Sequence, residues 1–285
     1  SMPSLSLAHL HPNGEVTNET NTDFFQISGY NGPSTPSDVN YYNPSTNTWT
    51  SKAALTTPKF DVNFARVGNK LYGVGGRNYA GTNFRKMMIY NIDTNTWSEG
   101  TDYYTDLGKI GIVAVRTDIY TIGGEISSSG DCYGKCYKYN TLTNAYSALA
   151  DALEVVAGCG VVYYNGAIYI FGGTKAYDSF VKAIRKYTIA TNSWETLATT
   201  VPTSYVKTAA YYDNVHMSIG WNQHARYNIT SQTLTTGLGA HSQYAPFVAI
   251  TGNKLYFCTG GNTSAGSSAS ITKNCYRDLI TATVT

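Results

Sequence analysis

The sequence has few charged residues and no long apolar run. Charged residues make up 13% of the 285 residues, about half the usual share of roughly 25%, and the formal net charge is only +2. Because no stripe of Lys and Arg is present, we expect neither nucleic acid nor an anionic membrane surface as a partner. No apolar stretch approaches the length of about 18 residues that a membrane-spanning helix needs, so we expect no membrane insertion.

The sequence also lacks the motifs of common catalytic sites. It contains no Gly-x-Ser-x-Gly motif, no phosphate-binding glycine loop before a helix, and no helical periodicity. Its carboxylates are scattered and do not define a pair of the kind that glycosidases use. No acidic or cysteine partner stands at ligand spacing from the five histidines, which are His9, His11, His216, His224 and His241. We therefore expect no catalytic residues, no metal site and no cofactor, and we expect that the protein is not an enzyme.

Tyrosine is the residue in excess, with 25 copies, and it is accompanied by many Ser, Thr, Asn and Gly residues. A surface of low charge with this composition is typical of secreted and virion-surface proteins, so we expect an extracellular, cell-surface or virion-surface location. No signal peptide is visible, and the opening Ser1-Met2 is typical of a cloning remnant. We accordingly expect a monomeric domain, cut from a larger protein.

A short sequence motif recurs along the chain. Its clearest copy has the run Leu71–Gly76, which ends in paired glycines, then Ile89-Tyr90-Asn91, then Thr94-Asn95-Thr96-Trp97. Clear copies follow at 119–146 and 168–194, and weaker ones lie at 24–49, 216–228 and 255–276. The closing aromatic recurs at intervals of 48, 49 and 48 residues, at Trp49, Trp97, Tyr146 and Trp194. A period of roughly 40–50 residues with strand-type content predicts the blades of a propeller.

Each copy predicts four strands, which in the second copy are Val62–Val67, Lys70–Val74, Lys86–Tyr90 and Thr96–Ser98. The pattern of an apolar run, a Gly-Gly pair and a spaced Tyr and Trp resembles the kelch repeat over almost the whole chain. The fifth copy departs from it, because Trp221 replaces the second glycine. The resemblance implies a single all-β domain over residues 1–285, a six-bladed kelch-type β-propeller with four antiparallel strands per blade. The expected blades cover about 5–50, 60–98, 108–147, 156–196, 206–235 and 244–285.

The sequence leaves the closure of the ring open. Leu5–Leu10 is expected as the inner strand of the first blade, which makes Pro12–Asp23 a long polar insertion. Alternatively, Leu5–Leu10 is the outer strand of the sixth blade and locks the ring. The alternating segment Leu279–Val284 is a second candidate for that outer strand.

The loops after each glycine pair and the connections between blades vary most, and in propellers of this family both sets lie at the same end of the ring. Variable loops on a rigid scaffold usually carry binding, and Tyr with small polar residues is the composition of an adaptable recognition surface. The expected ligand-binding residues are Tyr30, Arg77, Tyr79, Arg85, Tyr103, Tyr133, Tyr177, Tyr205, Trp221, His224, Arg226 and Tyr244. Many of these aromatics could instead pack one loop against another, and a structural pairing in the degenerate fifth blade is the alternative for His224.

We expect a non-catalytic recognition module in which Arg77, Arg85 and Arg226 anchor a ligand. A glycan fits the neutral, aromatic loops, as in an adhesin or a phage tail-type receptor-binding domain. A protein ligand fits the kelch resemblance, as in intracellular adaptors. The same resemblance includes enzymes, namely a copper radical oxidase, whose residues cannot be matched here, and a sugar (sialic acid) epimerase, which is the alternative function.

The five cysteines allow several pairings. Cys132 and Cys136 lie in one loop at a spacing that permits a local disulfide or, less readily, two zinc ligands. Cys258 and Cys275 are expected on neighbouring strands of the sixth blade, either bridged or as buried thiols. Cys159 is left without a partner.

Overall fold

The computed structural model describes residues 13–14, 23–30, 35–126, 130–176, 179–202, 206–219, 223–238, 247–251, 254–261 and 271–279. These residues form antiparallel strands joined by turns, which confirms the all-β prediction. Within these ranges, no helix has the length and apolar character needed to cross a membrane.

Five sheets of four strands follow one another along the chain. The first contains β1 (Asn13–Gly14), β2 (Phe24–Ile27), β3 (Val39–Asn43) and β4 (Thr48–Lys52). The second contains β5 (Phe64–Val67), β6 (Lys70–Val74), β7 (Met87–Asn91) and β8 (Thr96–Glu99). The third contains β9 (Gly111–Val115), β10 (Asp118–Glu125), β11 (Cys132–Asn140) and β12 (Ala145–Ala148). The fourth contains β13 (Gly160–Tyr164), β14 (Ala167–Phe171), β17 (Ala183–Thr188) and β18 (Ser193–Thr200). The fifth contains β19 (Val206–Tyr211), β20 (Asn214–Ile219), β21 (Gln223–Asn228) and β22 (Thr233–Thr235).

A sixth sheet has three strands among the described residues, β23 (Phe247–Thr251), β24 (Lys254–Gly261) and β25 (Ile271–Leu279). A small hairpin of β15 (Thr174–Ala176) and β16 (Ser179–Phe180) is added beside the fourth sheet. The prediction of four antiparallel strands per blade is confirmed for five sheets, and a complete sixth blade stays a prediction.

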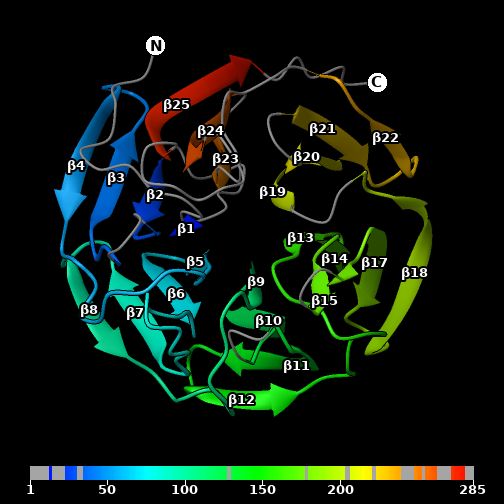
Figure 1. The fold of residues 1–285 in the computed structure, drawn as a ribbon, viewed down its shortest axis with the longest axis horizontal. Helices are drawn as coiled ribbons and strands as arrows, with labels where there is room; N and C mark the ends of the chain where they lie inside the picture. Colours follow the sequence, from blue (N-terminus) through cyan, green and yellow to red (C-terminus); the bar gives the residue numbers. More distant parts are fainter. Residues whose placement is uncertain are drawn as a thin grey trace.

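The sheets are arranged as a ring with their first strands around the axis and their last strands outside (Figure 1). Buried apolar side chains fill the seam between each sheet and the next. The last seam joins the sixth sheet to the first, where the rings of Phe24 and Tyr256 lie 5.1 Å apart. Because every sheet packs against two neighbours, neither face of a blade is left exposed.

The recurring motif forms a set of hydrogen bonds between blades, which we call the polar lock. In the second sheet, the Tyr90 hydroxyl donates to Asn95 Oδ1 at 2.7 Å, and the same oxygen accepts from the Ala53 amide at 2.8 Å. The indole Nε1 of Trp97 donates to the Ala53 carbonyl at 2.8 Å. Asn95 adopts a φ of 56°, a left-handed conformation that asparagine tolerates. The Asn, Tyr and Trp of the motif therefore fasten the outer hairpins of the second and fourth sheets to the preceding connections.

The glycine pair allows the close approach of the following blade. Gly123 has a φ of 60°, and a Cβ at this position would lie 1.9 Å from the Val156 carbonyl oxygen. Its neighbour Gly124 donates its amide hydrogen to that same oxygen at 2.9 Å. A side chain at Gly123 would push the next blade away, which explains why the repeat requires glycine here.

The closure of the ring differs in part from expectation. The inner strand of the first sheet includes Asn13–Gly14, which pairs with β2 inside the segment expected as an insertion. Leu5–Leu10 lies outside the described residues, so neither interpretation of it is tested. Of the candidate outer strand Leu279–Val284, only Leu279 is described, and it ends β25.

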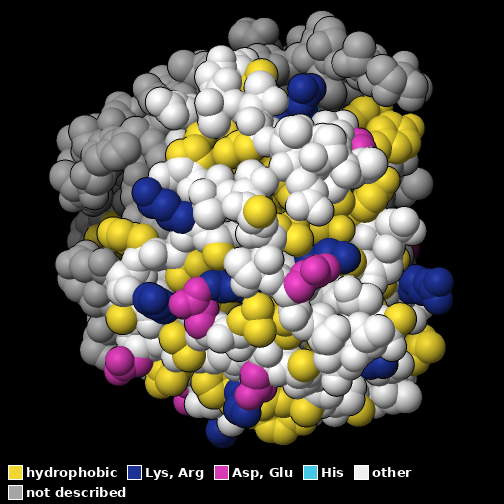
Figure 2. All heavy atoms as spheres, turned by 90° about the vertical axis from the view of Figure 1, so that its right-hand side faces the viewer, with side chains coloured by type: hydrophobic (Ala, Val, Ile, Leu, Met, Phe, Trp, Pro, Cys, Tyr) yellow, Lys and Arg dark blue, Asp and Glu magenta, His cyan; other side chains and the backbone are white. Residues whose placement is uncertain are grey.

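Charged side chains are sparse on the side of the ring drawn in Figure 2, where Lys, Arg, Asp and Glu lie scattered among uncharged groups. Several charged groups form pairs, for example Lys186 with Glu195 at 2.8 Å. This side therefore presents no large field of one sign, in agreement with the composition.

Candidate functional site

The site is built at the end of the ring where β6, β10 and β14 finish. Here the connection that follows the second sheet contacts the loop after its glycine pair: the Tyr103 amide donates to the Arg85 carbonyl at 2.8 Å. The Leu107 amide donates to the Phe84 carbonyl at 3.0 Å. The two sets of variable loops therefore meet at one end of the propeller, as expected.

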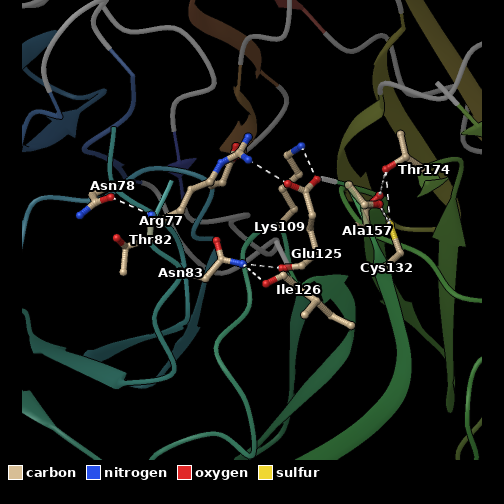
Figure 3. A network of polar contacts seen from close by, with 12 residues as sticks. Arg77, Asn78, Thr82, Asn83, Lys109, Glu125, Ile126, Cys132, Ala157 and Thr174 are labelled. Carbon is tan, nitrogen blue, oxygen red and sulfur yellow. Dashed lines mark hydrogen bonds and ion pairs between the residues drawn. The ribbon is translucent and has the colours of Figure 1, made fainter. Parts of the chain in front are cut away.

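Four charged side chains converge at this end, and three of them, Arg77, Lys109 and Glu125, are labelled in Figure 3. Arg77 spans two carboxylates, with 2.7 Å from Nη2 to Asp61 Oδ2 and 2.8 Å from Nη1 to Glu125 Oε1. Lys109 Nζ lies 2.7 Å from the second oxygen of Glu125. Both carboxylates are buried, at 8% exposure for Asp61 and 5% for Glu125. Each buried charge is therefore matched by an opposite charge.

Backbone contacts hold this network in place. Arg77 forms an isolated antiparallel bridge with Phe60, and Glu125 forms the equivalent bridge with Gly108. The Lys109 amide donates to the Asp61 carbonyl at 2.7 Å, which links the connections before the two inner strands. Asn83 Nδ2 donates to the Glu125 carbonyl at 2.8 Å. The network is thus a rigid part of the scaffold.

A lysine crosses the axis below this network. Lys207 on β19 donates to Asn63 Oδ1 at 3.5 Å, although β19 and β5 belong to sheets on opposite sides of the ring (Figure 1). Asn63 Nδ2 in turn donates to the Ile110 carbonyl at 2.7 Å. Burial lowers the pKa of Lys207, while the charge of Asp61 acts in the opposite direction. Lys207 and Asn63 therefore form a polar contact between opposite sides of the ring.

Three of the expected binding residues come together beside the network. The rings of Tyr30 and Tyr79 are stacked at 6.0 Å with an interplanar angle of 16°, and Tyr30 also contacts Phe60 at 5.3 Å. The Arg77 guanidinium lies over the Phe60 ring at 5.2 Å. Tyr79 is 57% exposed. We call Tyr30, Phe60, Arg77 and Tyr79 the Tyr79 cluster.

A second group of aromatics lies at the seam of the second and third sheets. Tyr104 is stacked on Tyr137 at 4.3 Å, and Tyr103 meets Tyr137 edge-on at 5.3 Å. The Tyr133 hydroxyl is 3.4 Å from that of Tyr137. Burial raises the pKa of Tyr103, Tyr137 and Tyr146, so these phenols stay protonated.

Two of the predicted ligand contacts are buried. Tyr103 is only 2% exposed, because it packs under the exposed Tyr104, so a ligand at this point meets Tyr104 first, and a contact with Tyr103 stays a prediction. His224 is 6% exposed and shares a 2.9 Å hydrogen bond with His216. Its surroundings match the alternative interpretation, a structural pairing in the fifth blade.

The other expected residues lie apart from the Tyr79 cluster or are not described. Arg85 is paired with Asp102 at 3.5 Å, and Arg226 lies on β21 opposite His216. Outside the described residues are Tyr177, Tyr205, Trp221 and Tyr244.

The structure decides against the Cys132–Cys136 disulfide that the sequence left open. Both thiols are free, and the two residues lie on one strand, β11. Four residues of extended chain span about 13 Å, well beyond the 4.4–6.8 Å or so that a disulfide requires between Cα atoms. Burial raises the pKa of Cys136 and of the free Cys159 to about 12, so both are protonated at neutral pH. Cys258 and Cys275 are register partners on β24 and β25, as the neighbouring-strand prediction requires.

No group of three His, Cys, Asp or Glu side chains in the described part of the chain is placed to hold a metal ion.

Sequence reasoning missed the charged network, although a signal was available. Arg77 and Glu125 each follow a glycine pair, 48 residues apart, and Asp61 and Lys109 precede successive inner strands at the same interval. The charges at these equivalent positions are exchanged between the two blades. Aligning the copies by position, and comparing charge at each, would have paired these four residues.

Comparisons with known proteins agree with this structure. The Kelch motif family model matches residues 60–102 and 156–200. Kelch-like protein 36 of Mus musculus is 29% identical over 177 residues, which cover 59% of this chain and 28% of that protein. Kelch-like protein 23 of Homo sapiens is 25% identical over 174 residues, covering 60% of this chain and 30% of that protein. This chain thus spans less than a third of the length of these relatives.

A solved structure of YjhT has the same fold. It superposes with a TM-score of 0.81 at 14% sequence identity and covers 99% of this chain and 98% of that chain. At this identity the likeness concerns the fold alone. Two stretches of the chain match the Kelch motif model, and together with the ring of sheets and the structural likeness they show that the fold is an all-β kelch-type β-propeller.

Proposed function

We propose that this propeller is a non-catalytic recognition module that binds a glycan through the Tyr79 cluster. The observation that carries the proposal is the exposed Tyr79 ring stacked on Tyr30, next to the fixed guanidinium of Arg77. A flat aromatic ring stacks on the apolar face of a pyranose, and it loses little conformational entropy when it does so. The low net charge favours a neutral ligand and a location at a cell or virion surface.

The cluster is prepared for binding because its parts are already held. Arg77 is fixed by Asp61 and Glu125, and the Tyr79 amide donates to Thr35 Oγ1 at 2.9 Å. A ligand therefore meets a surface that has little freedom left to lose, which favours affinity. A protein ligand at the same cluster is the alternative within this function.

A glycan-array binding assay tests the proposal. Binding by the natural chain should fall about threefold to tenfold in Tyr79→Ala, since one aromatic contact contributes roughly 0.5–1.5 kcal/mol beyond its buried area. Tyr212→Ala is the matched control, because Tyr212 is 56% exposed but lies in the β19–β20 turn, at the opposite end of the ring. Binding that both variants retain would overturn the assignment of the site.

If the natural chain binds no glycan on the array, the glycan proposal itself is overturned. Chemical cross-linking of the protein to candidate protein ligands would then test the alternative ligand class. A protein ligand at this cluster requires that Tyr79→Ala abolish the cross-link.

A sugar epimerase is the second candidate function, and the charged network is the feature that suggests it. Arg77 and Lys109 meet two carboxylates near the axis, the kind of group that a sugar epimerase would use to move a proton. The pairing counts against it, because both oxygens of Glu125 are engaged by cations and neither is free to act as a base.

NMR of sialic acid and neutral reducing sugars, incubated with the protein, separates the two functions. A recognition module should leave the rate of anomer and epimer exchange unchanged. Acceleration that Glu125→Gln abolishes, with unchanged thermal stability, would replace our proposal with the enzymatic one.

A further inference from the structure

A second aromatic platform lies away from the Tyr79 cluster. Tyr104, in the connection between β8 and β9, is stacked on Tyr137 of β11 at 4.3 Å with an interplanar angle of 24°. It is nevertheless 56% exposed. Because Tyr137 covers one face of the ring, we assign most of that exposure to the opposite face.

The platform is rigid. Tyr137 is 9% exposed and Tyr103 only 2%, and Tyr103 meets the Tyr104 ring at 6.1 Å in an edge arrangement. Tyr146 packs against Tyr104 at 5.9 Å from another side. The exposed ring is thus supported by three others, so a ligand that stacks on it restricts little additional motion.

Hydrogen-bonding groups border the platform in matched pairs. Lys86 Nζ lies 2.9 Å from Asp102, which is two residues before Tyr104 in the chain. Lys135 Nζ lies 2.6 Å from Asp151, whose charge contributes to raising the pKa of Tyr137. All four side chains are about half exposed. Lys86 also contacts Glu99, and Asp102 also contacts Arg85, so the charges beside Tyr104 balance and the donors and acceptors suit the hydroxyl groups of a neutral sugar.

The arrangement repeats that of the Tyr79 cluster. In both places one tyrosine, more than half exposed, lies flat on a second tyrosine at the loop end of the ring. The loop that carries Tyr79 also carries Arg85, which pairs with Asp102 beside Tyr104. The two platforms are therefore presented by connected loops of the second sheet.

We propose that Tyr104 is a second stacking subsite for a pyranose, so that this end of the propeller contacts two sugar residues of one glycan. This inference takes its ligand class from the proposed function but concerns a separate site. Two weak subsites on one scaffold raise the affinity for an oligosaccharide above that for a monosaccharide, without any new contact. Neutral oligosaccharides with exposed apolar ring faces are the expected ligands.

Saturation-transfer NMR tests the subsite with methyl β-glucoside, methyl β-galactoside and N-acetylglucosamine, and with cellotetraose, lactose and chitotetraose as longer probes. We expect Tyr104→Ala to weaken binding of at least one longer probe by about threefold to tenfold. Tyr104→Phe keeps the ring and should bind within about twofold of the natural chain. Tyr212→Ala, equally exposed at the other end of the ring, should change nothing.

The outcomes separate the subsite from the proposed function. If Tyr79→Ala weakens binding and Tyr104→Ala does not, the function stands and the subsite is overturned. If Tyr104→Ala weakens binding of a longer probe and Tyr79→Ala does not, the subsite stands and the Tyr79 assignment fails. If no probe receives saturation from the natural chain, both are overturned.

Discussion

The fourth and fifth blades have the same strand order but differ in how their outer hairpins are fastened. In the fourth, the Tyr187 hydroxyl donates to Asn192 Oδ1 at 2.7 Å, and Trp194 Nε1 donates to the Ala150 carbonyl at 3.0 Å. The equivalent residues of the fifth are Tyr227, Gln232 and Leu234. Here the Tyr227 hydroxyl is buried and has no hydrogen-bond partner among the described residues.

The fifth blade keeps its place through apolar packing and a hydrogen bond to the backbone of its turn, from Thr199 Oγ1 of β18 to the Gln232 carbonyl at 2.8 Å. Tyr227 is fully buried and contacts Phe171 of the fourth blade at 5.5 Å, within a seam of Val, Ile, Met and Tyr side chains. Gln232 keeps the left-handed conformation of the turn, with a φ of 54° against 50° for Asn192. The comparison teaches that seam packing suffices for the shape of a blade, whereas the polar lock adds stability to it.

The largest effect should come from filling the space that the glycine pair keeps open. Gly123→Ala should destabilise the protein by about 3 kcal/mol or more, because its Cβ would meet the Val156 carbonyl of the next blade at 1.9 Å. Gly166→Ala is the matched control, with a φ of 80° and no atom within 4 Å of the added Cβ, and should cost only about 1 kcal/mol. Urea unfolding measures both. Equal losses would show that backbone conformation, and not the approach of the blades, requires the glycine.

Removing the polar lock should matter in the fourth blade and not in the fifth. Asn192→Ala takes the acceptor from both the Tyr187 hydroxyl and the Ala150 amide, and we expect a loss of about 2 kcal/mol. Gln232→Ala, at the same position of a turn with a similar φ, should cost less than about 0.5 kcal/mol. Chemical denaturation compares the two variants, and similar losses would contradict the difference drawn between the blades.

Acid should weaken the fifth blade before the fourth. Burial, together with the charges of His224 and Arg226, lowers the pKa of His216 to about 3, whereas an unfolded histidine titrates near 6.5. The unfolded state therefore binds the proton more strongly, so this contribution is full above about pH 6.5 and is lost as the pH falls toward 3. At pH 5 the loss should approach about 2 kcal/mol.

Hydrogen exchange at pH 7 and pH 5 locates this effect. Amides of β20 and β21 should lose protection relative to those of β14 and β17, which carry no histidine. A uniform loss in all four strands would show that the histidine pair is not responsible.

The recurring motif predicted the fold because each of its residues has a local structural role that can be recognised from the residue type and its spacing. The glycine pair, the turn asparagine and the closing aromatic residue recur in every clear copy, so their spacing was enough to predict the architecture. The site was harder to predict. Tyr103 and Tyr104 are identical neighbours in the sequence, and only packing buries the first and exposes the second. Asp61, Arg77 and Glu125 meet across two blades, and such a contact depends on how the ring closes.

The smallest expected effect is a repair of the fifth blade. Gln232→Asn shortens the side chain to the one that the first four copies have five residues after the tyrosine, and should give the Tyr227 hydroxyl an acceptor. The buried hydroxyl then regains a hydrogen bond, so we expect a gain of about 0.5–1 kcal/mol in the free energy of unfolding. Tyr227→Phe should be nearly neutral in the natural chain and destabilising in Gln232→Asn, whereas Tyr187→Phe should be destabilising from the start. A double-mutant cycle of Gln232→Asn with Tyr227→Phe measures this coupling directly. A coupling near zero would mean that the turn of the fifth blade holds its side chain away from the tyrosine, and that the blade differs from the fourth in its backbone as well as in its residues.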